Sequence, residues 1–350
     1  MLHKIKVNAG LSILIILLGT NIFSCKKKSN VDESLQINAP VFTDQYTISG
    51  SKIYKYNTPV HLIGANAFHI FSAGSSDMKN WNIDIAREFV GNVKEVPLSG
   101  NPVQSINGQY LHSLQAIIDS NRKDNRITIL CAFGWDGTSA TEYTGKRPSQ
   151  TLWWQNHKIK LQQWAAYFKN QKDVWIEVWN EPYRYDRADG YTDDIWMNDM
   201  NEMVAVIRNA GNENVIIVPC AEQGQDETVL INKGALFLNS KKNILFDVHA
   251  YEKWLLVSNA NMGSRLQNLK TNNLPVIFGE TAPLNAGVLM NTKPFLDSIY
   301  NLGFSVTAWV WKYSSNDKDA LLDDNGLPNN NGNNNWGSTF KAITTKPRNP

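Results

Sequence analysis

The chain has 350 residues, of which 42% are apolar and 19% are charged, and its formal net charge is +2. The 34 basic and 32 acidic side chains nearly cancel, which argues against a protein that binds nucleic acid through clustered Lys and Arg. The content of 12 Trp, 12 Tyr and 13 Phe argues against an intrinsically disordered chain. The composition therefore indicates a folded, Trp-rich protein whose ligand is uncharged.

The first 24 residues have the pattern of an export signal. Met1–Lys6 is basic, and Leu11–Phe23 is an apolar run too short for a transmembrane helix. The following Ser24-Cys25 resembles the end of a bacterial lipoprotein signal, in which cleavage precedes a cysteine that is then lipidated. An ordinary signal peptide that is cut near Ser24 and leaves a free thiol is the alternative.

The lipoprotein interpretation predicts where the protein resides. We expect residues 1–24 to be removed, Cys25 to carry the lipid, and residues 25–40 to form a polar tether. The protein would then be secreted across the inner membrane and anchored to the outer membrane, facing either the periplasm or the cell surface. Without Lys4 and Lys6 of the signal, 32 basic and 32 acidic residues remain, so the mature chain is formally neutral.

After a predicted hairpin over Phe42–Tyr56, short apolar runs alternate with longer amphipathic segments, which is typical of strands covered by helices. The predicted strands are Val60–Asn66, Asn92–Leu98, Arg126–Ala132, Val174–Asn180, Val215–Cys220, Ile244–His249, Pro275–Glu280 and Phe304–Trp311. The predicted helices include Tyr110–Lys123, Leu152–Asn170, Ile195–Ala210, Glu227–Leu238 and Pro294–Leu302. Eight such units predict an α/β fold, a (β/α)8 TIM barrel over residues 41–345. A doubly wound open sheet is the alternative, but no Gly-rich turn follows the first strand.

Cysteine and histidine residues give no pattern of a metal site. Cys131 and Cys220 lie inside apolar runs, as core residues do. The six histidines include no His-x-His or HExxH spacing. We therefore expect neither a metal nor a cofactor.

Two glutamates end predicted strands of the barrel, at the edge where active sites of this fold lie. Glu181 follows the fourth strand and precedes Pro182, which cannot continue a ladder. Glu280 ends the apolar seventh strand, where burial of an unpaired charge would be costly. One such Glu could simply pair with a surface lysine, but two at strand ends of one barrel indicate a pair of catalytic carboxylates.

These residues resemble the motifs of glycoside hydrolase family 5, the cellulase and mannanase family of retaining (β/α)8 enzymes. Asn180-Glu181-Pro182 matches the family's Asn-Glu-Pro, which implies that Glu181 is the general acid/base and that Asn180 contacts a sugar hydroxyl. Glu280 matches the nucleophile, and His249-Ala250-Tyr251 matches the motif whose Tyr bonds to the nucleophile. The segment Ala308–Lys312 resembles the eighth-strand segment whose last Trp, here Trp311, forms the floor of the cleavage subsite.

The resemblance implies an endo-acting β-1,4-mannanase or cellulase that hydrolyses a neutral polysaccharide by double displacement, as a monomer. In that mechanism Glu280 attacks the anomeric carbon, and Glu181 first protonates the leaving oxygen and then activates water. The two carboxyl groups are then expected about 5–5.5 Å apart, against roughly 6.5–9.5 Å in an inverting enzyme. Glu181 needs a raised pKa and Glu280 a low one.

Two departures from the family pattern support a second hypothesis. On the predicted second strand Glu95 occupies the place of the usual Arg, with Lys94 beside it, and Phe133 stands where the third strand commonly ends in His. A catalytically weakened, sugar-binding lipoprotein on the same barrel is therefore the alternative. An aldolase-like enzyme would need a strand-end lysine, for which Lys312 is the candidate.

Five tryptophans at or near strand ends are candidate sugar platforms, because sugars pack their C–H faces on aromatic rings. Trp311 is the main candidate, Trp135 and Trp254 are loop candidates, and the other two are Trp179 and Trp309. Four others are expected in the core: Trp81, Trp164, Trp175 and Trp196.

Overall fold

The structure is a computed structural model that describes residues 46–69, 76–90, 96–104, 110–132, 134, 143–312 and 317–348. The predicted signal peptide, Cys25 and the tether lie outside the described residues. So do Lys94, Glu95, Phe133 and Trp135, on which two departures and one candidate platform depend.

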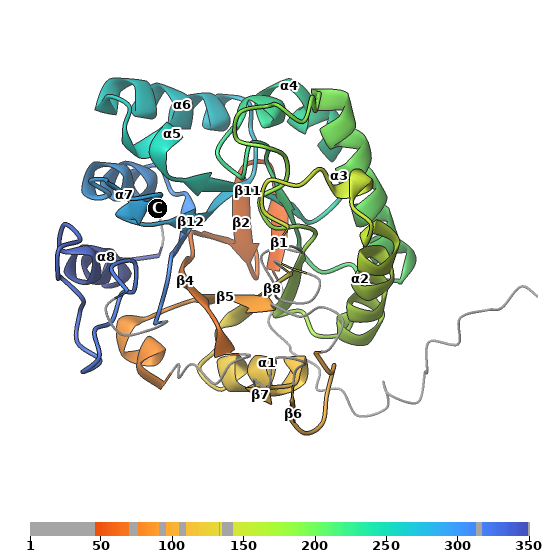
Figure 1. Cartoon of the computed structure of the whole chain (residues 1–350), viewed down its shortest axis with the longest axis horizontal. Coiled ribbons are helices and arrows are strands. Elements are labelled where there is room, and N and C mark those ends of the chain that lie inside the picture. The colour runs from red at the N-terminus through yellow and green to blue at the C-terminus, as the bar shows by residue number, and fades with distance from the viewer. Residues whose placement is uncertain are drawn as a thin grey trace, which may run out of the picture.

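Eight parallel strands close into a barrel, and helices surround it (Figure 1), which confirms the predicted (β/α)8 fold. Each strand pairs with its neighbours in chain order, and the last pairs with the first. The barrel strands are β4 (Ile63–Ala67), β5 (Ile85–Val90), β8 (Ile127–Ala132), β9 (Val174–Glu177), β10 (Ile216–Pro219), β11 (Ile244–Ala250), β12 (Val276–Thr281) and β15 (Ser305–Ala308).

The second strand is not where the sequence predicted it. The structure places it at Ile85–Val90, before the predicted Asn92–Leu98. The segment was missed because Arg87 and Glu88 interrupt its apolar pattern, although every residue of β5 is buried. The charges are tolerated there because both side chains have buried partners: Arg87 donates to Glu280 within the barrel, and Glu88 accepts a hydrogen bond from buried Asn121. The other seven predicted strands each overlap an observed one.

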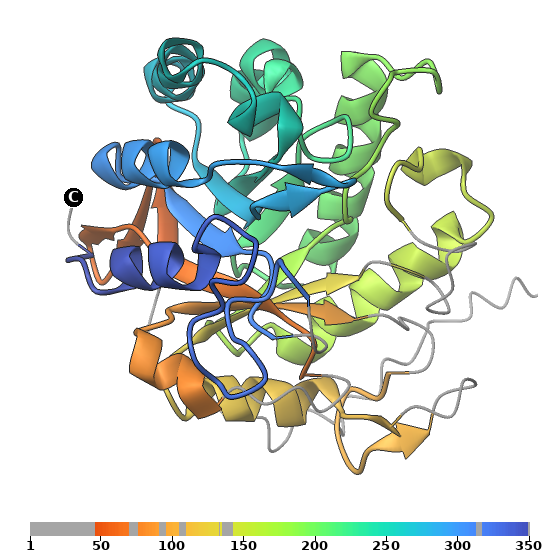
Figure 2. The ribbon, with the colours of Figure 1, turned by 60° about the vertical axis from the view of Figure 1, so that its left-hand side comes forward.

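The helices begin and end at the signals expected from their residue types. Ser113, Thr192 and Ser258 each accept a hydrogen bond from the backbone N–H three residues on, as N-caps do. Figure 2 shows α7 and α8 side by side on the outside of the barrel. The helices are α1 (Leu114–Arg122), α2 (Trp154–Phe168), α3 (Asp193–Asn209), α4 (Thr228–Leu238), α5 (Glu252–Leu255), α6 (Asn259–Thr271), α7 (Lys293–Asn301) and α8 (Trp336–Thr344), with 3-10 turns at Ser76–Trp81 and Pro148–Gln150.

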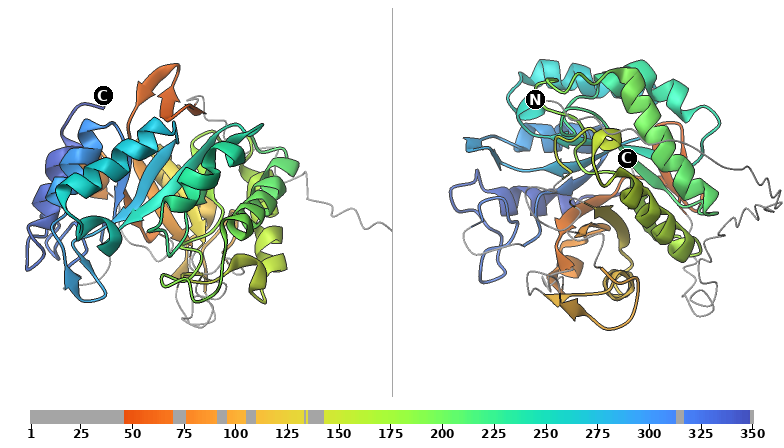
Figure 3. Two further views of the ribbon diagram at one scale, coloured as in Figure 1. Left: turned by 90° about the horizontal axis from the view of Figure 1, so that it is seen from above. Right: turned by 45° about the vertical axis from the view of Figure 1, so that its right-hand side comes forward.

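The predicted N-terminal hairpin closes the amino end of the barrel. It consists of β1 (Tyr46–Ser49) and β2 (Lys52–Lys55), continued by β3 (Thr58–Val60). Tyr46 packs edge-on against Trp175, with ring centroids 5.6 Å apart, and Ile53 joins the same buried cluster. The hairpin stands at the end opposite the loops that follow the strands (Figure 3, left). This arrangement leaves the carboxyl end of the barrel for a site.

Smaller features complete the fold. Cys131 and Cys220 are buried free thiols, which confirms their core placement. Trp81, Trp164, Trp175 and Trp196 are buried as predicted. Across the described residues, we find no helix with the length and apolarity needed to traverse a lipid bilayer. Four two-residue strands form two small ribbons at loops: β6 (Val103–Gln104) with β7 (Tyr110–Leu111), and β13 (Leu284–Asn285) with β14 (Val288–Leu289).

Candidate active site

Glu181 lies just beyond β9, in a backbone conformation with φ of 47°. Its side chain is 16% exposed, and it accepts hydrogen bonds from Thr144 Oγ1 at 2.9 Å and, through its other oxygen, from His249 Nδ1 at 2.9 Å. The neighbouring Asn180 is buried and donates to Thr144 Oγ1 at 3.2 Å. The predicted acid thus reaches solvent while its carboxyl group is held from two sides.

Glu280 lies near the end of β12, buried within the barrel mouth. It accepts hydrogen bonds of 2.7 Å from Arg87 Nη1 and of 2.7 Å from the Tyr251 hydroxyl, one on each carboxylate oxygen. His249 Nδ1 lies 3.5 Å away. Tyr251 therefore bonds to Glu280 as the sequence predicted, and these donors fix the direction of the carboxylate.

The two glutamates face each other across His249. One oxygen of Glu181, one oxygen of Glu280 and one ring nitrogen of His249 all lie within 4.8 Å of one another. The strands β9 and β12 that carry the glutamates are separated around the barrel by β10 and β11. The barrel thus brings together five of the predicted site residues: Asn180, Glu181, His249, Tyr251 and Glu280.

Arg87 supplies the cation that the sequence analysis judged to be missing. Its guanidinium is fully buried and reaches Glu280, so the expectation that Glu95 takes this place is wrong. The physical reason is the position of the second strand, Ile85–Val90, whose third residue is Arg87. Arg87 also donates a hydrogen bond of 3.0 Å from Nη2 to the side-chain oxygen of Asn180.

Glu177 holds Arg87 from behind. Two hydrogen bonds of 2.7 Å join the Glu177 carboxylate to Nε and Nη2 of Arg87, a bidentate pair in which both side chains have no exposed surface. Asn66 Oδ1 accepts a further hydrogen bond of 2.8 Å from Nη1 of Arg87. Glu177 is the last residue of β9, four residues before Glu181.

A second buried carboxylate, Asp247, contacts both His249 and strand β12. Asp247 Oδ2 lies 3.2 Å from His249 Nε2, and Oδ1 accepts a bond of 2.6 Å from the backbone N–H of Gly279. A side chain at position 279 would collide with this carboxylate, which explains the glycine before Glu280. Gly224 is similarly required, because a Cβ there would lie 2.7 Å from His249 Cγ and its φ is +76°.

The charges in the barrel mouth shift one another's pKa values. Burial disfavours a charged imidazole, but Glu280 and Asp247 together raise the pKa of His249 well above its ordinary value, which favours the protonated ring. Burial raises the pKa of Glu177 to about 7 despite the adjacent Arg87. Protonated His249 can donate to both Glu181 and Asp247.

The expectation of a low pKa for Glu280 is wrong for the protein without substrate. Burial is the largest effect and raises the pKa of Glu280, while His249, Arg87 and Tyr251 act in the opposite direction. The negative charge of Glu181 adds to the rise. Ionisation of Glu280 is therefore favoured by its three donors and opposed by burial and by the charge of Glu181.

Two groups of acidic residues and histidine have spacings that a metal ion could use. They are Glu177, Asp247 and His249, and Glu181, His249 and Glu280. Arg87 already places its guanidinium 2.7 Å from Glu177 and Glu280 and 3.8 Å from Asp247. The positive charge of Arg87 thus offsets the charge of these carboxylates, and we assign no metal to them.

Trp311 is not a sugar platform in this structure. It is 1% exposed and packs edge-on against Trp81, with ring centroids 5.2 Å apart. Trp309, two residues earlier, is only half-buried. It packs edge-on against Phe68 and Phe89, at 5.7 Å and 5.0 Å, and also contacts the cluster that contains Tyr251.

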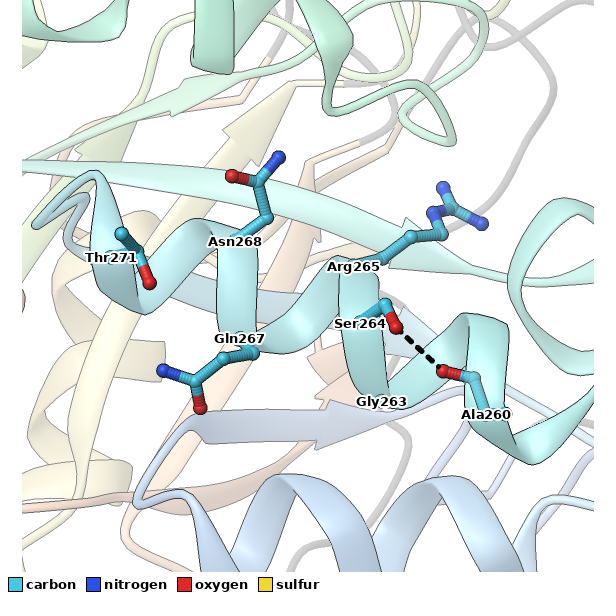
Figure 4. A pocket seen from close by; sticks show the side chains of 7 residues that line it. All are labelled: Ala260, Gly263, Ser264, Arg265, Gln267, Asn268 and Thr271. Atoms are coloured by element: carbon cyan, nitrogen blue, oxygen red, sulfur yellow. Dashed lines mark hydrogen bonds between the residues drawn. The ribbon is translucent and has the colours of Figure 1, made fainter.

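Trp254, a predicted loop platform, is also buried. Its indole N–H donates to the backbone oxygen of Gln225 at 3.1 Å, and the Arg265 guanidinium lies 3.7 Å from the ring centroid. Figure 4 shows Arg265 beside a shallow depression along α6. The residues that line this depression come from that one helix, on the outside of the barrel, so it is separate from the site at the barrel mouth.

Several known proteins resemble this chain. A family profile described as Cellulase (glycosyl hydrolase family 5) matches residues 53–315. A mannan endo-1,4-beta-mannosidase of Cellvibrio japonicus is 27% identical over 151 residues, which cover 42% of this chain and 34% of that enzyme. The match therefore spans about a third of the length of the curated relative.

Solved structures share the fold. The catalytic domain of a mannanase from Streptomyces sp. SirexAA-E superposes with a TM-score of 0.67 at 17% identity, covering 90% of this chain and 96% of that one. A mannohexaose complex of a Thermomonospora fusca β-mannanase gives 0.64 at 16% identity, covering 86% and 97%. The catalytic domain of an endoglucanase from Thermobifida fusca gives 0.63 at 16% identity, with the same coverage. Because the family profile spans well over half of the residues, this chain belongs to glycosyl hydrolase family 5, the cellulase family.

Proposed function

We propose that this glycoside hydrolase is a retaining endo-β-1,4-glycanase whose substrate is mannan. The observation that carries the proposal is the pair of carboxylates, Glu181 and Glu280, with oxygens within 4.8 Å of each other. That separation suits direct attack by one carboxylate and leaves little room for the water that an inverting enzyme places between them. The mannanases among the relatives favour mannan over cellulose.

The proposed reaction proceeds in two displacements. Glu280, directed by Arg87 and Tyr251, attacks the anomeric carbon while the Glu181 carboxylic acid gives its proton to the leaving oxygen. The glycosidic bond breaks and a glycosyl ester forms on Glu280. Glu181, now a carboxylate, takes a proton from water, which attacks the same carbon and releases Glu280.

Protonated His249 has a matching role in this scheme. Its Nδ1 lies 2.9 Å from Glu181 and 3.5 Å from Glu280, so it can stabilise negative charge on whichever carboxylate is ionised. Trp309, half-buried beside Tyr251, is the proposed apolar floor under the reacting sugar. Asn180, held by Arg87 and Thr144, is the proposed partner of a hydroxyl on that sugar.

The alternative of a weakened, sugar-binding protein rested chiefly on the missing arginine. Arg87 removes that reason, because it contacts Glu280 directly. The remaining departure, Phe133, lies outside the described residues.

Hydrolysis assays test the proposal. Release of reducing ends from β-1,4-mannan, carboxymethylcellulose and xylan is measured for wild type, Glu280→Ala and the matched control Glu213→Ala, which alters an exposed loop. We expect wild type and Glu213→Ala to cleave mannan fastest, and Glu280→Ala to lose at least about 10³-fold in kcat. Equal rates for wild type and Glu280→Ala would overturn the proposed catalysis, and faster cleavage of cellulose would overturn the choice of mannan.

A further inference from the structure

Tyr185 is an exposed aromatic residue four positions after Glu181, on the loop between β9 and α3. Of its surface 39% is exposed, whereas the nearby Tyr183 and Tyr191 of the same loop are buried. We propose that Tyr185 is the platform for a sugar unit on the leaving-group side of the scissile bond. This inference rests on the proposed function and names a binding residue for that same reaction.

Lys253 holds the Tyr185 ring in place. Its ammonium lies 3.9 Å from the ring centroid, and it donates a hydrogen bond of 3.0 Å to the backbone oxygen of Tyr185. The same ammonium forms an ion pair with buried Glu222. One face of the ring is thus occupied by a fixed cation, so the opposite face is the one available for stacking. A ring that is already ordered loses little conformational entropy when a sugar packs on it.

The backbone on either side of Tyr185 is also fixed. Tyr183 is buried, and its hydroxyl donates to Asp199 at 2.9 Å. The backbone N–H of Gln223 donates to the oxygens of Pro182 and Tyr183, both at 3.1 Å. On the other side, Arg187 pairs with Glu222 and Asp226. The loop therefore anchors Tyr183 inward and presents Tyr185 outward as a rigid unit.

The position of this loop matches the leaving-group side of the reaction. Glu181 must touch the glycosidic oxygen, so the sugar that departs with that oxygen lies beside the acid and the loop that continues from it. Lys253, beneath the Tyr185 ring, is two residues from Tyr251, which bonds to Glu280. One short segment thus connects the platform with the nucleophile.

Polar groups suited to sugar hydroxyls lie next to this platform. Glu252 accepts hydrogen bonds from Asn285 at 3.0 Å and from Gln225 at 3.4 Å. Both Glu252 and Glu222 are close enough to raise the pKa of Tyr185, after the larger effect of partial burial. An aromatic face bordered by carboxylate and amide groups has the chemistry that recognises a neutral sugar ring.

Two substrates that differ in the leaving group test the proposal. In β-1,4-mannopentaose the leaving group is a sugar, whereas in a 4-nitrophenyl β-mannobioside it is a phenol. We expect Tyr185→Ala to lower kcat/KM about tenfold on mannopentaose. On the aryl mannobioside the loss in kcat/KM should be several-fold smaller than that. Tyr185→Phe, which keeps the ring, is expected to stay close to wild type. The control Tyr56→Ala removes a 55% exposed tyrosine from the hairpin at the opposite end of the barrel.

Equal losses on the two substrates would show that Tyr185 only supports the position of Glu181, and no loss on mannopentaose would remove it from the site. Either result overturns the proposal. If wild type cleaves neither substrate, the proposed function fails. A binding measurement then tests the role of Tyr185 independently of catalysis. The Kd for mannohexaose is measured by titration for the Glu280→Ala protein and for the double variant that also carries Tyr185→Ala. We expect the second substitution to raise the Kd about tenfold, and an unchanged Kd overturns the proposal.

Discussion

Arg87 links the two halves of the site at the scale of single residues. It contacts Glu280, the proposed nucleophile, on one side and is held by Glu177 on the other, with none of the guanidinium exposed. A buried arginine with a planar fork of donors can be fixed in direction by a bidentate carboxylate. Glu177 therefore positions Arg87, and through it Glu280.

The variant Glu177→Gln tests this positioning. Gln has nearly the same size but cannot accept from both Nε and Nη2 of Arg87, so Glu280 loses its fixed direction. We expect kcat to fall by about 10–100-fold with little change in KM, since the contacts of the bound substrate remain. Steady-state kinetics on mannan measure this, with exposed Glu213→Gln as the control. A kcat within twofold of wild type contradicts the role of Glu177.

Because of buried His157, we expect the free energy of unfolding to fall in acid. It is fully buried, lies 3.0 Å from the Tyr143 hydroxyl and 2.7 Å from the Val178 oxygen, and burial lowers its pKa to about 4. The unfolded chain takes up a proton near pH 6.5 and the folded chain only near pH 4, so stability falls as the pH drops through that window. The full effect is about 3 kcal/mol.

Urea unfolding of wild type and His157→Gln at pH 7 and pH 5 measures this contribution. The variant loses native hydrogen bonds and is expected to be less stable at both pH values. Its difference between pH 7 and pH 5 should be smaller than that of wild type by about 2 kcal/mol. If both proteins lose the same stability on acidification, His157 is not the source of the pH dependence.

At the scale of elements, most of the barrel could be predicted from alternation of apolar runs and amphipathic helices, because strands such as β10 and β12 contain few polar residues. β5 could not, since Arg87 and Glu88 look like surface residues until the barrel supplies their partners. The same reason hid the site's main cation. The signal that could have identified β5 is a pair of charged residues flanked on both sides by apolar ones, as in Ile85–Val90.

The hairpin that closes the amino end of the barrel is expected to contribute stability and not catalysis. Ile53 is 4% exposed and packs in the cluster with Ile85, Ile127 and Trp175. Ile53→Ala should lower the free energy of unfolding by about 2–5 kcal/mol through lost burial and a cavity. Chemical denaturation measures this, and kcat at 25 °C should be unchanged. Exposed Lys52→Ala on the same hairpin is the control, expected within about 0.5 kcal/mol of wild type. Equal stability of all three proteins contradicts the closing role.

At the scale of the site, the strand-end motifs gave Glu181, Glu280, Asn180, His249 and Tyr251, because these residues follow recognisable strands. The choice between Trp309 and Trp311 needed the structure. Both lie in one aromatic segment, and only the packing of Trp311 against Trp81 shows which ring is turned into the core. Partners that come from distant segments, such as Thr144 and Asp247, likewise have no local signal.

For the whole molecule, the sequence predicts a lipid anchor at Cys25 and export from the cytoplasm. Expressed from the full chain in a Gram-negative bacterium, the protein should sediment with membranes and incorporate labelled palmitate. Cys25→Ala should abolish labelling and move the protein out of the membrane fraction, with hydrolysis of mannan retained. Labelling of the Cys25→Ala protein, or an unlabelled wild type, contradicts the predicted anchor.

The measurement that tests the central claim most directly is the stereochemistry of the first product. Hydrolysis of mannohexaose by wild type is followed by proton NMR, before the released sugars mutarotate. Double displacement through Glu280 predicts that the β-anomer forms first and that the α-anomer rises only later. If the α-anomer forms first, water attacks directly, and the assignment of Glu280 as nucleophile is wrong.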